Sequence, residues 1–250
     1  MSKKVLIIDI GNTSTDFAIF EDGNLRDFLG FFKIPSAKEE AKKALISYKN
    51  NGGNIDDGMI FSVKPRNDET IRSIVKDVFG KVLPVFDWKN YVLKNKSPRI
   101  TEAIGADLLA DLRQADEEYK GPCLIADFGT VTKLLHIDRN GAFVGLSFIP
   151  GVEISADLFN KNTALLPEVD ELEVNKGRLG LNSLESMCHG IYYSQVYYVK
   201  EVLRSLNDKD IKLLLTGGNL RYVKDEFKEA IIDPRLTLKG MYILYMETLK

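Results

Sequence analysis

The chain has 250 residues, of which 44% are apolar and 28% charged, a composition typical of a globular protein with a full hydrophobic core. Its net charge of −2 excludes the broad positive field of most nucleic-acid-binding proteins. The sequence holds no run of 18 apolar residues, and its first apolar run meets Asp9 too early for a signal peptide. We therefore expect no membrane span, a cytoplasmic location, and two cysteines that are reduced and buried.

Short apolar runs rich in Val, Ile and Phe predict strands bounded by Gly, Asn, Asp or Pro. In chain order these runs cover residues 4–10, 15–21, 59–63, 83–88, 123–128, 132–138 and 212–218. Apolar side chains at helical spacing predict helices over 69–80, 104–115 and 187–202. Strands that alternate with helices indicate an α/β fold with mixed sheets.

One pattern occurs twice, in "LIIDIGNTSTDFAIFEDGNL" (6–25) and "LIADFGTVTKLLHIDRNGAF" (124–143). In each copy an apolar run ends on an aspartate, and a turn glycine follows that aspartate by 14 residues (9 to 23, and 127 to 141). Asp-Gly and Asn-Gly between alternating runs are hairpin signals. The repeat predicts two similar domains, 1–118 and 119–250, that face each other across a cleft, with the boundary near the polar break at 117–122.

The residues at the two strand ends suit a phosphate. A glycine lets the backbone approach a ligand closely, and hydroxyl and amide groups beside it add neutral donors. The carboxylates of Asp9 and Asp127 need a cation between them and the phosphate, and Mg²⁺ binds in this way. The alternative is that each motif is a hairpin whose polar side chains satisfy local backbone groups. The predicted ATP- and phosphate-binding residues are Asp9, Ile10, Gly11, Asn12, Thr13, Ser14, Thr15, Asp16, Gly129, Thr130, Thr132 and Gly217.

Asp107 is the candidate catalytic residue. It follows Gly105 near the start of a predicted helix, and phosphoryl transfer needs a group that orients the acceptor hydroxyl and takes its proton. The alternative is a helix N-terminal aspartate favoured by the helix dipole, and the local pattern by itself favours that alternative. Asp111, one turn further on, is expected to be a surface carboxylate.

Together these stretches resemble the type III pantothenate kinases, members of the actin-like and hexokinase-like phosphotransferase superfamily. "DIGNT" (9–13) is similar to the first phosphate motif of the family, and "DFGTVT" (127–132) to its Asp-x-Gly-Thr-x-Thr motif. Further similar segments follow in order: "IFSVKP" (60–65), "TALLPEV" (163–169), "LGLNSLESMCHGIYY" (179–193), "LLTGGN" (214–219) and "LTLKGM" (236–241).

The resemblance implies two actin-like (ribonuclease H-like) domains and ATP-dependent phosphorylation of pantothenate, the first step of coenzyme A biosynthesis. It implies Asp107 as the proton acceptor, Asp127 as ligand of a monovalent cation (K⁺ or NH₄⁺), and Thr130 as an ATP contact. Asp9 then remains on the Mg²⁺–phosphate side. The substrate-binding residues implied are Gly105, Ala106, Asp107, Leu108 and Ser183, the last of which reaches pantothenate across a homodimer interface.

The sequence departs from the family on the substrate side. Leu108 stands where the family has arginine, Leu146 replaces a glycine, and no tyrosine lies between Lys94 and Ile104. An arginine can hold a carboxylate by paired hydrogen bonds, and leucine offers none. Two alternatives therefore stay open: a weak or inactive relative that acts as a nucleotide-binding regulatory protein, and a kinase for another hydroxyl substrate.

A homodimer is also expected from the tyrosines of the 187–202 segment. Tyr192, Tyr193, Tyr197 and Tyr198 supply more aromatic surface than one buried helix face uses. Tyrosine is enriched at protein interfaces because its ring buries while its hydroxyl finds a partner.

Overall fold

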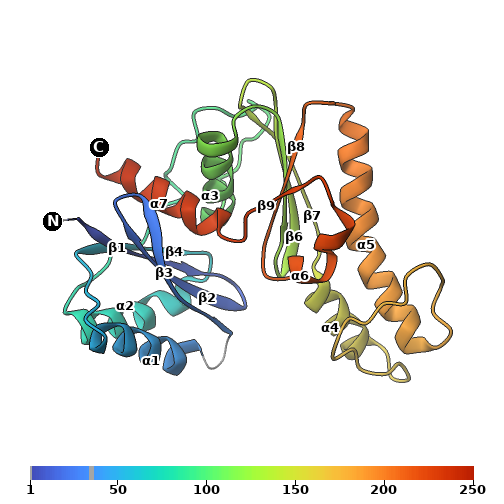
Figure 1. The fold of residues 1–250 in the computed structure, drawn as a ribbon, viewed down its shortest axis with the longest axis horizontal. Coiled ribbons are helices and arrows are strands. Elements are labelled where there is room, and N and C mark those ends of the chain that lie inside the picture. The colour runs from blue at the N-terminus through green and yellow to red at the C-terminus, as the bar shows by residue number, and fades with distance from the viewer. Residues whose placement is uncertain (1, 34–36) are drawn as a thin grey trace. The chain divides into compact units, whose positions relative to one another are not determined.

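The computed structural model describes residues 2–33 and 37–250, which form two units with separate cores (Figure 1). The first unit contains the described residues up to Lys94, together with Pro98–Glu118 and Arg235–Lys250. The second unit contains Asn95–Ser97 and Tyr119–Pro234.

The first unit is built on a four-stranded sheet with the order β3-β2-β1-β4. Its strands are β1 (Lys4–Ile10), β2 (Ser14–Glu21), β3 (Asn24–Lys33) and β4 (Asp57–Ser62). Helices α1 (Ala37–Asn50) and α2 (Asp68–Phe79) cover one face, and α3 (Ala106–Gln114) and α7 (Leu236–Thr248) cover the other (Figure 1). Because both faces are covered, β1 reads as a nearly continuous apolar run rather than an alternating one.

The second unit is built on a five-stranded sheet with the order β7-β6-β5-β8-β9. Its strands are β5 (Cys123–Phe128), β6 (Val131–Ile137), β7 (Phe143–Pro150), β8 (Lys212–Thr216) and β9 (Ile231–Ile232), and its helices are α4 (Val152–Asn162), α5 (Ser183–Leu206) and α6 (Leu220–Val223). The core lies where Val196 and Val199 of α5 pack against Leu124 and Phe128 of β5.

The two sheets confirm the repeat that the sequence predicts. In each, the motif strand pairs antiparallel with the next strand and parallel with a later one: β1 with β2 and β4, and β5 with β6 and β8. The first connection after the repeated aspartate is a tight turn in both copies. Two α/β units of one topology are therefore present, as the fold prediction required.

Most predicted strands lie within two residues of the observed ones, but the strand predicted over 83–88 is wrong. This segment makes one bridge, between Val85 and Ile60, and no ladder. The amide of Ile60 donates to the carbonyl of Pro84, and the amide of Phe86 donates to the carbonyl of Ile60, which together make this bridge. Pro84 has no N–H with which to extend the pairing.

The last sixteen residues return to the first unit, whereas the sequence placed 235–250 in the second domain. Gly240 of α7 lies directly on α3, so close that a Cβ there would stand 1.8 Å from the carbonyl oxygen of Ala110. Tyr242 stacks on Phe20 of β2 with 4.6 Å between ring centroids. The division at 118/119 stays a prediction for the domains, while these contacts place α7 in the core of the first unit.

The expectation that Asp111 is a surface carboxylate is wrong. Asp111 is fully buried, and its Oδ1 accepts a hydrogen bond of 2.7 Å from the hydroxyl of Thr237 on α7. The local sequence predicted that this side of α3 faces solvent, but α7, from the far end of the chain, covers it.

Candidate active site

The first phosphate motif forms the tight turn between β1 and β2. The amide of Gly11 donates to the carbonyl of Ser14 at 2.9 Å, which closes the turn. Asn12 and Thr13 are exposed at its tip, and the Lys64 ammonium donates to the carbonyl of Asn12 at 2.5 Å. Lys64 comes from the segment after β4, so a cation that the sequence analysis did not single out supports this turn.

Asp9 and Asp16 lie side by side at this end of the first sheet. They are directly opposite in the antiparallel register of β1 and β2, so their side chains share one face. Burial raises the pKa of the Asp16 carboxyl to about 7, and the Arg235 guanidinium opposes part of that rise. Two adjacent carboxylates next to a phosphate-type turn fit Mg²⁺ carried by a nucleotide, which needs only one or two protein carboxylates.

Two predicted residues of this motif turn inward. Ile10 is fully buried and Thr15 is 1% exposed, so their side chains belong to the core of the first unit. Any ligand contact they make uses the backbone. Asn12 and Thr13 are exposed, and Asp9, Gly11, Ser14 and Asp16 are partly exposed.

In the second motif the predicted cation ligand already has a cationic partner. Asp127 is the penultimate residue of β5 and pairs directly with Lys133 of β6, and the Lys133 Nζ lies 2.5 Å from the Asp127 Oδ2. Only 8% of the Asp127 side chain and 14% of the Lys133 side chain are exposed. The sequence analysis missed Lys133, although hairpin pairing across the short turn after β5 would have placed it opposite the aspartate.

The turn after Asp127 is enclosed by main chain that only glycine permits. Gly217 has a φ of +95°, and a Cβ there would stand 2.4 Å from the Asp127 Oδ1. A Cβ on Gly151 would stand 2.3 Å from the carbonyl oxygen of Gly129. Buried Asn219 holds the same turn, since its amide N–H donates to Phe128 and its side chain donates to the carbonyl of Gly129.

The two threonines of this motif differ. Thr130 is partly exposed at the turn, next to Gly129. Thr132 is 1% exposed, and its hydroxyl donates to the Gln195 side chain of α5 at 2.5 Å. Gln195 in turn donates to the carbonyl of Pro150, so Thr132 ties β6 and β7 to α5 rather than offering its proton to a ligand.

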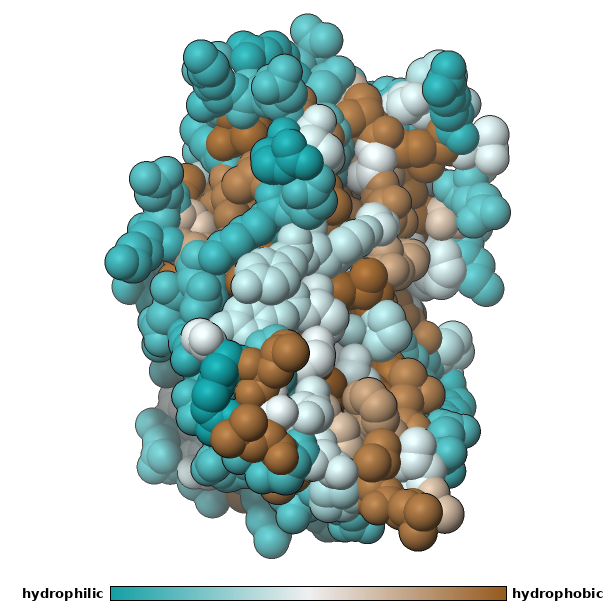
Figure 2. Space-filling model, turned by 90° about the vertical axis from the view of Figure 1, so that its right-hand side faces the viewer, coloured by the Kyte–Doolittle hydropathy of each residue, from teal (hydrophilic) through white to brown (hydrophobic). Residues whose placement is uncertain are grey.

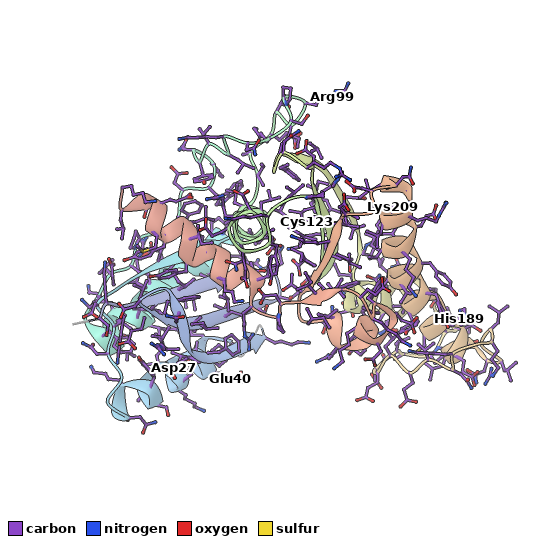
Figure 3. The ribbon with its side chains drawn as sticks, turned by 45° about the horizontal axis from the view of Figure 1, so that its top comes forward. Asp27, Glu40, Arg99, Cys123, His189 and Lys209 are labelled. Carbon is purple, nitrogen blue, oxygen red and sulfur yellow. The ribbon has the colours of Figure 1, made fainter. Side chains whose placement is uncertain are left out.

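The candidate catalytic residue stands at the start of α3. Gly105 is the N-cap, Ala106 is the first helical residue, and Asp107 is partly exposed in the first turn, where a negative charge is stabilised by the helix dipole. Ala106 and Leu108 are buried, at 1% and 7% exposure. Arg99 lies exposed at the tip of the loop before α3 (Figure 3).

Ser183 is exposed at the first turn of α5. The amide of Glu185 donates to the Asn182 side chain at 2.9 Å, which caps the helix and fixes the position of Ser183. A surface hollow in the second unit adjoins these residues, lined also by Phe159, Leu166, Gly180 and Met187.

The predicted site residues are thus divided between the two units. Asp9 to Asp16 and Gly105 to Leu108 lie in the first unit, and Asp127 to Thr132 with Gly217 and Ser183 lie in the second. The common cleft stays a prediction. Within residues 2–33 and 37–250, no helix is both long and apolar enough for a membrane span, and no three His, Cys, Asp or Glu side chains gather as a metal site.

Two α/β units of one topology, each with an aspartate at the penultimate position of a strand and a glycine turn directly after that strand, define an actin-like fold. Solved structures with the same fold include a conserved putative Baf family transcriptional activator from Campylobacter jejuni, with a TM-score of 0.59, 17% identity and 98% of each chain covered. Another is the activator of the 2-hydroxyisocaproyl-CoA dehydratase from Clostridium difficile with bound ADPNP, with a TM-score of 0.50, 13% identity, and 100% of this chain and 96% of that one covered.

The family known as type III pantothenate kinase matches residues 5–205. A protein of Agathobacter rectalis named type III pantothenate kinase is 31% identical over 252 aligned residues, which cover 96% of each chain. The chain therefore belongs to the type III pantothenate kinase family.

Proposed function

We propose that this protein transfers the γ-phosphate of ATP to the primary hydroxyl of pantothenate, the first step of coenzyme A biosynthesis. Family membership over residues 5–205 is the observation that carries the proposal. The two glycine turns bring residues to the surface at Gly11–Ser14 and at Gly129–Thr130, and backbone and hydroxyl groups of this kind suit phosphates. Asp107 supplies a partly exposed carboxylate at a helix start.

In the proposed reaction the pantothenate hydroxyl oxygen forms a bond to the γ-phosphorus, and the bond from that phosphorus to the β,γ-bridging oxygen breaks. ADP leaves with the electron pair, and the hydroxyl proton passes to the Asp107 carboxylate. Such a transfer depends on positioning and charge stabilisation more than on covalent chemistry. The backbone donors of the two turns stabilise the charge on the phosphate oxygens.

A divalent cation, when bound with the nucleotide, neutralises charge on the β- and γ-phosphates. Asp9 is the residue proposed to hold Mg²⁺ through the phosphates, with Asp16 beside it on the same face of the sheet. The monovalent cation implied for Asp127 is not part of this proposal, because the Lys133 ammonium already contacts that carboxylate.

The test is a phosphorylation assay with purified protein, ATP and Mg²⁺, with pantothenate present or omitted. The expected result is ADP release and a phosphorylated product only when pantothenate is present. ATP binding without any pantothenate-dependent ADP release would contradict the proposal.

One observation favours a second candidate, a nucleotide-binding regulatory protein. Leu108 is buried and apolar where the family has an arginine, so this position offers the substrate carboxylate no partner. A kinase for a different hydroxyl compound is compatible with the same observation. Screening other small alcohols in the assay above separates the two, since a regulatory protein phosphorylates none of them.

We also propose a homodimer, on the basis of the second unit's surface. Tyr197 is 60% exposed and stacks on Tyr193 of α5, with 4.8 Å between ring centroids. Leu146 and Phe148 of β7 are exposed by 41% and 54%. Figure 2 views the molecule from the α5 side and shows brown apolar side chains among polar ones. Light scattering at micromolar concentration is expected to give the dimer mass, and a monomer mass would contradict this part of the proposal.

A cytoplasmic location belongs to the proposal as well. Cys123 and Cys188 are both free and buried, which suits a reducing compartment. Figure 3 shows Cys123 at the start of β5, inside the second unit.

A further inference from the structure

The Asp127–Lys133 pair is a nearly solvent-free ion pair at the second phosphate-type turn. The two residues are cross-strand partners, so the backbone register of β5 and β6 sets their proximity. Their exposed side-chain fractions of 8% and 14% show that little water reaches either charge. A buried carboxylate is costly unless a cation and hydrogen bonds compensate it, and Lys133 supplies that compensation.

One carboxylate oxygen of Asp127 contacts a cation of the chain, and the other faces closely approaching main chain. The Lys133 Nζ lies 2.5 Å from Oδ2. The main chain of Gly217 crowds Oδ1, since a Cβ on that glycine would stand 2.4 Å from it. A free monovalent cation on this carboxylate would compete with the ammonium at Oδ2 and would find main chain close to Oδ1, so the residues present do not fit the exchangeable cation that the family resemblance implies.

The Lys133 side chain ends in an ammonium group, which carries the same positive charge as a free ammonium ion but is covalently attached to the protein. Because this ammonium group is part of the chain, no cation has to bind from solution when ATP binds, and the translational entropy of a free cation is not lost. The ammonium group neutralises Asp127, whose charge would otherwise oppose a phosphate at Gly129 and Thr130.

We propose that Lys133 takes the place of the monovalent cation, so that nucleotide binding by this protein is independent of K⁺ and NH₄⁺. Lys133 acts through Asp127 and the turn that follows it and is therefore a positioning residue. This inference rests on the proposed ATP-dependent function.

The first experiment uses the unmodified protein. The affinity for Mg²⁺–ATP is measured by calorimetry in potassium chloride and in choline chloride at equal ionic strength. The expected dissociation constants are the same in both salts. A wild-type protein that binds ATP tightly only when K⁺ or NH₄⁺ is present would overturn the inference.

The second experiment removes the tethered charge with Lys133→Met. In choline chloride this variant is expected to bind ATP about tenfold to a hundredfold more weakly, the range that corresponds to the loss of a hydrogen bond to a charged group. Added K⁺ or NH₄⁺ is expected to restore affinity. A Lys133→Met protein whose affinity is unchanged and insensitive to K⁺ would also overturn the inference.

Melting temperatures give a readout that needs neither nucleotide nor activity. K⁺ is expected to raise the melting temperature of Lys133→Met, because it can compensate the buried Asp127 charge that has lost its ammonium partner. The charge-balanced double variant Asp127→Asn/Lys133→Met lacks both charges and is expected to show no such K⁺ effect. Lys209→Met removes a lysine from the exposed loop after α5 and serves as the surface control (Figure 3).

The experiments distinguish failure of the proposed kinase function from failure of the proposed role of Lys133. ATP binding that is indifferent to K⁺ in the wild type and dependent on it in Lys133→Met supports the inference even when pantothenate is not phosphorylated. Pantothenate phosphorylation that requires K⁺ supports the proposed function and removes the role of Lys133.

Discussion

Replacing Asp16 by asparagine is expected to stabilise the protein at neutral and alkaline pH. Burial holds the pKa of this carboxyl at about 7, against 3.8 for an ordinary aspartate. The folded state therefore binds the proton more tightly than the unfolded chain does, and stability falls as the pH rises from about 4 to about 7. Asparagine carries no charge at any of these pH values, so the Asp16→Asn variant does not lose stability in this way as the pH rises.

The size of the effect follows from the two pKa values. A difference of one pKa unit corresponds to about 1.4 kcal/mol, so the full cost above pH 7 is on the order of 4 kcal/mol. Between pH 5 and pH 8 the expected loss is about 2–3 kcal/mol, because part of the cost is already present at pH 5. Asp16 is partly exposed, so the lower end of that range is the better expectation.

The assay is urea denaturation of wild type and Asp16→Asn at pH 5 and pH 8, without nucleotide or divalent cation. The advantage of the variant is expected to be larger at pH 8. Asp27→Asn changes an exposed aspartate on the neighbouring strand β3 and is the matched control, with no expected difference between the two pH values (Figure 3). An equal free-energy difference between wild type and Asp16→Asn at both pH values would refute the reasoning.

Three further variants test the site and the packing. Asp107→Asn is expected to lower turnover by roughly 10²–10⁴-fold with ATP affinity nearly unchanged, and a fully active variant would remove the proton-acceptor role. Gly240→Ala is expected to destabilise the protein severely in thermal denaturation, since its Cβ would stand 1.8 Å from the Ala110 carbonyl oxygen. Gly190→Ala is its control, because nothing lies within 4 Å of a Cβ at this position of α5, and it should stabilise by about 0.5–1 kcal/mol. Leu108→Arg is expected to lower the melting temperature rather than to recruit pantothenate, because the side chain it replaces is only 7% exposed; a stable variant with a lower Michaelis constant for pantothenate would show that the guanidinium escapes the core.

The sequence by itself determined the parts of this protein that depend on neighbouring residues. The strands at 4–10 and 123–128 were predicted to the residue, because an apolar run that ends at a small polar turn specifies a strand and its end locally. The doubled motif also predicted the repeated topology, since a hairpin of the same spacing imposes the same antiparallel start on both sheets.

Only the tertiary structure decided which polar groups are buried and what they face. Asp111 is buried because α7 arrives from the end of the chain, and the pKa of Asp16 is raised because the surrounding unit removes water from it. The ion pair between Asp127 and Lys133 lies between these cases: its pairing follows from a local hairpin register, but its burial depends on Gly217 and the turn after β8. Neighbouring residues determine strands and turns, whereas the desolvation of a side chain depends on segments distant in the sequence. Desolvation determines how strongly these charged groups affect the stability of the fold.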